Sequence, residues 1–304
     1  MPHDEVSPWA VRRRVGLVVA AFLVLIIFLV VADFAWTWKS HEPRIAALVS
    51  EDPGTTSYMN RAARAGHRAN DRDWVTLGAV APVAACAVIL SEDGQFFNIG
   101  TINYDIQRQM LSRVLRGDFS RGGSGFAQQL ARNLFLGPQR TPRRKAREYL
   151  LAYQLSHALT KERQLEIYLN IVEWGDGIWG IGAASAHYFG LPPDQLAPAQ
   201  SVILASLLPA PRLEVRFALT ERAARKAAAI TRGLSRTMLI DDLARGATIE
   251  RLKLWRTAVA GGLNAADAFA SVESVMGREP LARALAGTDS RPIREACNGR
   301  RRPA

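Results

Sequence analysis

The feature that most constrains this chain is an uncharged apolar run near its start. Residues 15–32 read VGLVVAAFLVLIIFLVVA, eighteen residues without one charged side chain. At a rise of about 1.5 Å per residue, such a helix nearly crosses the hydrocarbon core of a bilayer. Phe34, Ala35 and Trp36 lengthen it. Because a helix that is apolar on every side has no polar face to turn toward water, we interpret residues 15–38 as a transmembrane anchor.

The residues around this run predict its orientation. Three arginines at positions 12–14 precede it, and Trp36 and Trp38 lie where an aromatic belt is expected at the interface. The basic cluster favours a cytoplasmic tail over residues 1–14, so the rest of the chain lies on the outer side. The residues alone leave open a cleaved signal peptide, whose apolar stretch is usually shorter, and a buried core helix.

Composition narrows the class of partner. The chain has 304 residues, is 48% hydrophobic and carries a formal net charge of +11. This length allows one larger domain or two small ones. The charge suggests an anionic partner: nucleic acid, an anionic membrane surface or a phosphorylated substrate. We exclude DNA because no recognisable DNA-binding motif is present and a domain outside the cytoplasm does not meet DNA.

The two cysteines, Cys86 and Cys297, leave two readings open. Outside the cytoplasm they can form a disulfide, and otherwise one is a buried thiol and the other an exposed one. No pair or cluster of cysteines and histidines has the spacing of metal ligands.

Beyond the anchor, the chain divides into a connector, a domain and an extension. We predict a juxtamembrane connector over residues 39–77, a domain over 78–240, and a helical extension with a basic tail over 241–304. The apolar periodicity of the domain, rich in Ala, Leu, Arg and Glu, is typical of helices. The predicted fold class is therefore mostly α.

Two carboxylates follow an apolar run inside this domain. Glu92 and Asp93 belong to the stretch SEDGQFF, which comes directly after PVAACAVIL. Such a pair either forms a solvated turn at the end of a core helix or lies at the rim of a cleft, where a carboxylate can move a proton.

Two further segments combine cations with loops or carboxylates. The glycine-rich residues 122–125 lead into a helix bearing Gln128 and Arg132, and such turns bring backbone N–H groups to anions; a flexible linker is the alternative. In the next helix, which begins at Pro142, Glu148 shares a face with Arg144 and Lys145. That face either binds a phosphate or is a solvated, salt-bridged surface.

Taken in order, these segments resemble the five motifs of the peptidoglycan glycosyltransferase family, family 51, and within it the monofunctional biosynthetic transglycosylases. The matching segments are SEDGQFF, GGSGFAQQLARNLFL, RKARE, KERQLEIYLN and GIWGIGAASAHYFG. Single motifs of this kind are weak signals, whereas five in order are a strong one.

The resemblance implies a lysozyme-like helical glycosyltransferase domain beside the bacterial inner membrane, on its periplasmic side. It implies an enzyme that polymerises lipid II into β-1,4 glycan strands with inversion and releases undecaprenyl pyrophosphate. The implied partners are lipid II, the growing glycan chain and the membrane, together with penicillin-binding transpeptidases and division or elongation proteins. A divalent metal ion, Mg²⁺ or Mn²⁺, is a candidate cofactor, and no organic cofactor or nucleic acid is implied.

The resemblance also assigns roles to residues. Glu92 matches the catalytic general base, and Glu148 matches the second glutamate, which positions the pyrophosphate or its metal. The other matches bind substrate: Asp93, Arg108, Ser124, Gln128, Gln129, Arg132, Arg140 and Lys145.

The chain also departs from the family pattern. The usual His-x-Gly-x-Asp positions hold Ile99, Thr101 and Asn103, while Gly125 and Ala127 replace hydroxyl-bearing residues. These departures leave open a catalytically weak or inactive paralogue that acts as a scaffold for cell-wall synthesis. A glycan-cleaving enzyme is a third reading, because two carboxylates also suit a hydrolase.

Overall fold

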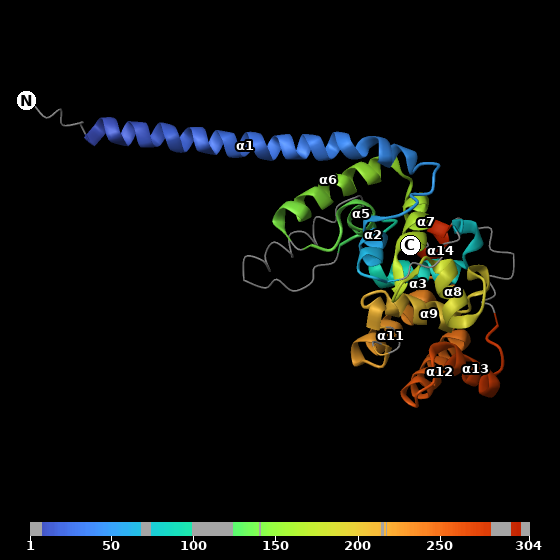
Figure 1. Ribbon diagram of the computed structural model, residues 1–304. Coiled ribbons are helices and arrows are strands. Elements are labelled where there is room, and N and C mark those ends of the chain that lie inside the picture. The colour runs from blue at the N-terminus through green and yellow to red at the C-terminus, as the bar shows by residue number, and fades with distance from the viewer. Residues whose placement is uncertain are drawn as a thin grey trace, which may run out of the picture.

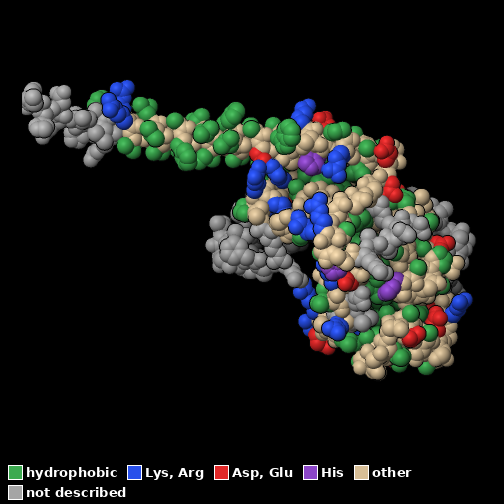
Figure 2. All heavy atoms as spheres, viewed as in Figure 1, with side chains coloured by type: hydrophobic (Ala, Val, Ile, Leu, Met, Phe, Trp, Pro, Cys, Tyr) green, Lys and Arg blue, Asp and Glu red, His purple; other side chains and the backbone are tan. Residues whose placement is uncertain are grey.

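A long helix and a body of shorter helices make up the structure (Figure 1). The computed structural model describes residues 8–67, 74–98, 124–139, 141–213, 216, 218–280 and 293–298. Helix α1 (Pro8–Ala47) extends away from the body, and its apolar side chains from Val15 to Val31 are exposed along its length (Figure 2). Within the described residues, α1 is the helix that is long and apolar enough to cross a membrane.

Helix α1 continues past residue 38, where the sequence predicted the anchor to end. Its last turns enter the body, and Ile45 and the following Leu48 are buried in the core. The apolar segment and the body are therefore joined by continuous helix. The predicted boundaries at residues 77 and 240 are not marked in this way and stay predictions.

The body consists of short helices, short 3-10 or π turns and one small antiparallel hairpin. In chain order these elements are α2 (Ser57–Arg64), η1 (Leu77–Ala79), α3 (Pro82–Glu92), α5 (Phe126–Ala131), η2 (Arg132–Leu136), α6 (Pro142–Ala158), α7 (Lys161–Ile171), β1 (Glu173–Gly175), β2 (Ile178–Trp179), α8 (Ile181–Phe189), η3 (Pro193–Gln195), α9 (Pro198–Leu207), η4 (Pro211–Leu213), α11 (Glu221–Arg236), α12 (Asp242–Ala260), α13 (Ala265–Met276) and α14 (Ile293–Asn298). In the hairpin, Glu173 pairs with Trp179.

Local sequence explains where the central helices begin. Pro142 is the first residue of α6, a position that needs no backbone N–H. The side chain of Thr141 accepts a hydrogen bond from Arg144 N at 3.1 Å, and Thr160 accepts one from Arg163 N at 3.1 Å at the start of α7. Threonine is a favoured N-cap residue for this reason.

Helix α3 lies at the centre of the core. Seven consecutive residues, from Val83 to Ile89, are buried, and the helix packs against α9, α11 and α14. This is the run PVAACAVIL of the sequence, apolar on every face because neighbours surround it. Its last residue, Glu92, is thus carried to the edge of the core.

The C-terminal segment is tied to this central helix. Cys86 in α3 and Cys297 in α14 form a disulfide, with their Cα atoms 5.1 Å apart. Arg294 of α14 also pairs with Glu162 of α7 and lies over the ring of Phe97. Of the two readings left open by the sequence, the disulfide is therefore the one that the structure shows.

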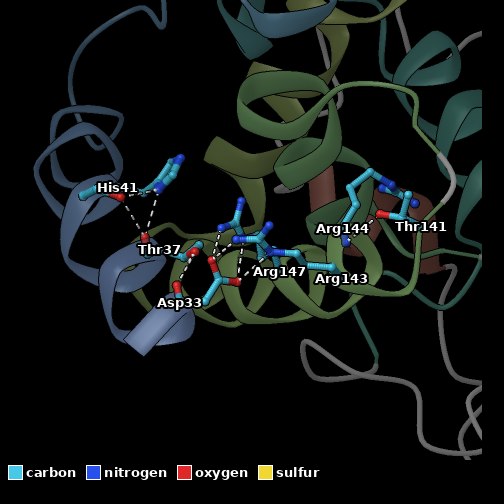
Figure 3. A network of polar contacts seen from close by, with 8 residues as sticks. Asp33, Thr37, His41, Thr141, Arg143, Arg144 and Arg147 are labelled. Atoms are coloured by element: carbon cyan, nitrogen blue, oxygen red, sulfur yellow. Dashed lines mark hydrogen bonds and ion pairs between the residues drawn. The ribbon is translucent and has the colours of Figure 1, made fainter. Parts of the chain in front are cut away.

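Two arginines of helix α6 form an ion-pair clamp on Asp33 of α1 (Figure 3). Oδ2 of Asp33 in α1 accepts from Arg143 Nε at 3.2 Å and from Arg147 Nε at 3.1 Å. Each of the two guanidinium groups also donates through Nη2 to the other carboxylate oxygen, Asp33 Oδ1. Further along, Gln154 Nε2 donates to the carbonyl of Trp38 at 3.2 Å. Asp33 directly follows the apolar run, so the clamp fixes α6 beside the C-terminal end of that run in α1.

We expect the disulfide to stabilise the fold through the unfolded state. It closes a separation of 211 residues, and removing such a bridge typically costs about 2–4 kcal/mol. Cys297→Ser should lower the urea midpoint, followed by tryptophan fluorescence in detergent micelles. Dithiothreitol should shift the wild type the same way and leave Cys297→Ser unmoved. Equal midpoints for the two proteins without reductant would contradict this expectation.

The clamp on Asp33 should also show in stability. Asp33→Asn leaves two arginines facing a neutral amide, and charged hydrogen bonds of this kind contribute about 1–3 kcal/mol. We expect a lower thermal midpoint of the full chain in micelles. The matched control is Asp242→Asn, whose exposed pair with Arg245 should contribute little. An Asp33→Asn midpoint no lower than that of the control would argue against the clamp.

Candidate active site

The carboxylate of Glu92 is held at the end of α3 by groups from three elements. Its Oε1 lies 2.8 Å from Lys226 Nζ of α11 and 2.9 Å from Ser91 Oγ, and its Oε2 lies 3.4 Å from Gln129 Nε2 of α5. The Glu92 side chain is 15% exposed. It is thus a partly buried, paired carboxylate and not a solvated turn residue.

A second layer orients Gln129. The hydroxyl of Tyr168 on α7 donates to Gln129 Oε1 at 3.1 Å, while Gln129 Nε2 also lies 3.1 Å from the Ser124 carbonyl. Burial, and next the charge of Glu92, raise the pKa of Tyr168 well above its usual value. Because Tyr168 therefore keeps its proton, it remains a donor and directs the amide N–H₂ of Gln129 toward Glu92.

Asp93 supports the start of α5. Its Oδ2 accepts from Phe126 N, the first N–H of that helix, at 3.1 Å. Burial is the main cause that raises the pKa of Asp93. A Cβ placed on Gly125 would lie 2.9 Å from this oxygen. The Asp93 carboxylate therefore satisfies a backbone N–H at the start of α5 and occupies the space that a side chain at position 125 would need.

A second cluster gathers on α6 around Lys145. Lys145 Nζ donates to Ser124 Oγ and to Gln128 Oε1, both at 3.1 Å, and pairs with Glu148. Arg144 pairs with the other oxygen of Glu148, which is 1% exposed. The expected shared face of these three residues is confirmed: Glu148 is buried, and Arg144 and Lys145 are partly exposed, at 15% and 27%.

Arg132 lines an open cavity that is also lined by Gln129, the partner of Glu92. It begins the π turn η2, in which Gly137 N donates to Arg132 O at 2.8 Å. The cavity has a volume of about 520 Å³ and is lined by Arg132, Gln129 and Tyr168 among others. Arg132 Nε is buried and finds no hydrogen-bond partner in the described part of the chain. The guanidinium of Arg132 brings a fixed positive charge to the cavity wall, which suits the binding of an anion there.

The structure thus brings most of the predicted residues into two adjoining groups. Glu92 and Gln129 form one, Lys145 and Glu148 the other, and Ser124 touches both through its carbonyl and its hydroxyl. Two predicted cations lie outside the described residues, Arg108 and Arg140, as do the departures at Ile99, Thr101 and Asn103. Ala127 is buried in α5.

The geometry does not suit a metal ion held by the protein. In the described ranges, no group of three His, Cys, Asp or Glu residues lies close enough to hold one. Both oxygens of Glu148 are already paired with cations of α6. A metal carried by Glu148 through a pyrophosphate stays a prediction that these ion pairs do not favour, and no step below depends on it.

Two polar residues of the site were missed in the sequence. Tyr168 lies among the apolar residues Leu165 and Leu169 of α7, so the sequence did not distinguish its hydroxyl from the core. Lys226 lies 134 residues from Glu92 in a helix with several other cations, so nothing local distinguishes it. Its pairing depends on how α11 packs.

Comparison with known proteins agrees with this geometry. The sequence profile of the transglycosylase family matches residues 59–235, more than half of the chain. The chain belongs to the transglycosylase family. The mostly helical, lysozyme-like fold with one long apolar N-terminal helix and the glycosyltransferase class are therefore confirmed.

Relatives named biosynthetic peptidoglycan transglycosylase share this region. The protein from Nitrosomonas europaea is 38% identical over 208 residues, which cover 68% of this chain and 82% of the relative. The one from Laribacter hongkongensis is 35% identical, covering 67% and 86%. The one from Rhizobium leguminosarum is 44% identical over 144 residues, covering 47% and 62%.

For this transglycosylase, the dependence of the Asp93 contact on a glycine at position 125 can be tested directly. Gly125→Ala should displace the Asp93 carboxylate from Phe126 N, with a loss of about 1 kcal/mol of stability. Gly125→Ser should lose less, because serine brings its own acceptor to the helix start. Both are compared by thermal unfolding with Gly246→Ala, a helix position with open space at Cβ. Equal stability of Gly125→Ala and wild type would refute this account.

Proposed function

We propose that this transglycosylase polymerises lipid II into β-1,4 glycan strands, with inversion and with release of undecaprenyl pyrophosphate. The observation that carries the proposal is the place of Glu92, a partly buried carboxylate that contacts Gln129, which lines a cavity together with Arg132. The names of the relatives, biosynthetic peptidoglycan transglycosylases, support the same reading.

The proposed reaction is a single displacement at the donor's anomeric carbon. The acceptor 4-hydroxyl oxygen bonds to that carbon as its bond to the pyrophosphate oxygen breaks, and the electron pair leaves with the pyrophosphate. The hydroxyl proton passes to Glu92 as general base. Attack opposite the departing group inverts the configuration.

Cations are needed where the pyrophosphate leaves, because negative charge develops on it in the transition state. Lys145 and Arg132 are the candidates within the described residues. Lys145 is held by Ser124 and Gln128, and Glu148 keeps it in place by pairing with it. Glu148 therefore acts through Lys145. Arg108 and Arg140 stay predicted members of this group.

The membrane helix suits a substrate with a lipid tail. Lys and Arg side chains gather where α1 meets the body (Figure 2). There they can meet anionic lipid headgroups and a pyrophosphate at the same surface. We propose that α1 spans the inner membrane with its N-terminus in the cytoplasm, which places the site in the periplasm. Penicillin-binding transpeptidases and division or elongation proteins are proposed partners.

Polymerisation of purified lipid II tests this proposal. The full chain in detergent should form glycan polymer, seen by gel electrophoresis, and Glu92→Gln should lower the rate by about 10²–10⁴-fold. The matched control is Glu250→Gln, an exposed glutamate on α12, which should leave the rate unchanged.

Three outcomes would overturn the assignment. No polymer from wild type, with lipid II still bound, would favour the scaffold. Fragments released from finished cell wall would favour the hydrolase. Full activity of Glu92→Gln would remove Glu92 as the base.

A further inference from the structure

Lys226 is the one cation that the described residues place against Glu92, and none of the sequence motifs includes it. Its Nζ lies 2.8 Å from Glu92 Oε1, and the two side chains are 20% and 15% exposed. Burying a lysine is costly unless the charge is paired. The pair thus holds Lys226 at the carboxylate and away from solvent.

The close packing of α11 against α3 brings Lys226 to Glu92. Gly233 lies two turns further along the helix, on the same face, and a Cβ at this position would lie 2.8 Å from the side chain of Leu90. The missing side chain lets α11 approach the last turn of α3, and Ile230 between them is buried. The neighbouring Arg225 points outward, with a side chain that is 75% exposed.

The two oxygens of Glu92 are held differently. Oε1 has two close donors, Lys226 Nζ at 2.8 Å and Ser91 Oγ at 2.9 Å. The hydroxyl of Ser91 has one proton and also lies 2.8 Å from the carbonyl of Ala205, so it can donate to only one of them at a time. Oε2 has one contact among the described residues, the 3.4 Å approach of Gln129.

We propose that Lys226 is a positioning residue for glycosyl transfer. It holds Oε1 of Glu92, and this leaves Oε2 as the oxygen that receives the proton of the acceptor hydroxyl. The inference rests on the proposed function, in which Glu92 is the base. Without Lys226, Oε1 keeps only Ser91 as a close donor and Oε2 keeps only the long contact to Gln129. The carboxylate is then held less firmly, and Oε2 is less well aligned with the acceptor hydroxyl.

The test compares three variants of the full chain in the lipid II polymerisation assay. Lys226→Met should lower kcat by about 10–100-fold, the loss expected when a reacting group is misplaced by about 1 Å, with little change in KM. Lys226→Arg keeps a cation at the site and should recover most of the rate. The control Arg225→Met removes the adjacent outward cation and should match wild type.

Each outcome of this test either supports or overturns the role proposed for Lys226. Active wild type with Lys226→Met equal to Arg225→Met would overturn this inference alone. A raised KM with unchanged kcat would also overturn it, because Lys226 would then bind substrate instead of aligning Glu92. Failure of Lys226→Arg to exceed Lys226→Met would do the same. Inactive wild type would overturn the proposed function and this inference with it.

Thermal unfolding separates these effects from a folding defect. If the Lys226→Met variant melts well below the Arg225→Met variant, the Lys226→Gln variant is used in its place, because glutamine is shorter, uncharged and polar. The same outcomes then apply to Lys226→Gln.

Discussion

A charge at the end of a buried helix has to be paired, and much of this structure follows from that constraint at Glu92. Helix α3 is surrounded by neighbours along most of its length, so its last residue reaches the edge of the core without leaving it. Lys226 from α11 and Gln129 from α5 then converge on one carboxylate. Because these partners come from separate elements, the position of the carboxylate depends on the packing of the whole domain.

Helix α6 contacts both the apolar N-terminal segment and the candidate active site. One face carries Arg143 and Arg147, which hold Asp33 at the end of the apolar run. A different face carries Lys145 and Glu148, which reach the start of α5. Helix α6 therefore relates the position of the apolar segment to that of these cations, as the proposed lipid-linked substrate would require.

The start of α5 is supported by another segment of the chain. Gly125, the N-cap residue, has no side chain, and the Asp93 carboxylate accepts from the first N–H of α5. The two positions depend on each other, because a side chain at 125 would need the space that Asp93 fills. Because these two segments lie far apart in the sequence, local reading of the sequence does not detect this dependence.

By itself, the sequence determined the helical class, the apolar N-terminal segment and the shared face of Lys145 and Glu148. Each of these follows from residues a few positions apart, where spacing and side-chain chemistry act directly. The resemblance supplied Glu92 and the family. Only the tertiary structure decided that Cys86 pairs with Cys297, that Asp33 meets two arginines, and that Lys226 reaches Glu92. Those contacts join residues more than 100 positions apart, and the packing of whole helices, which no local pattern records, brings them together.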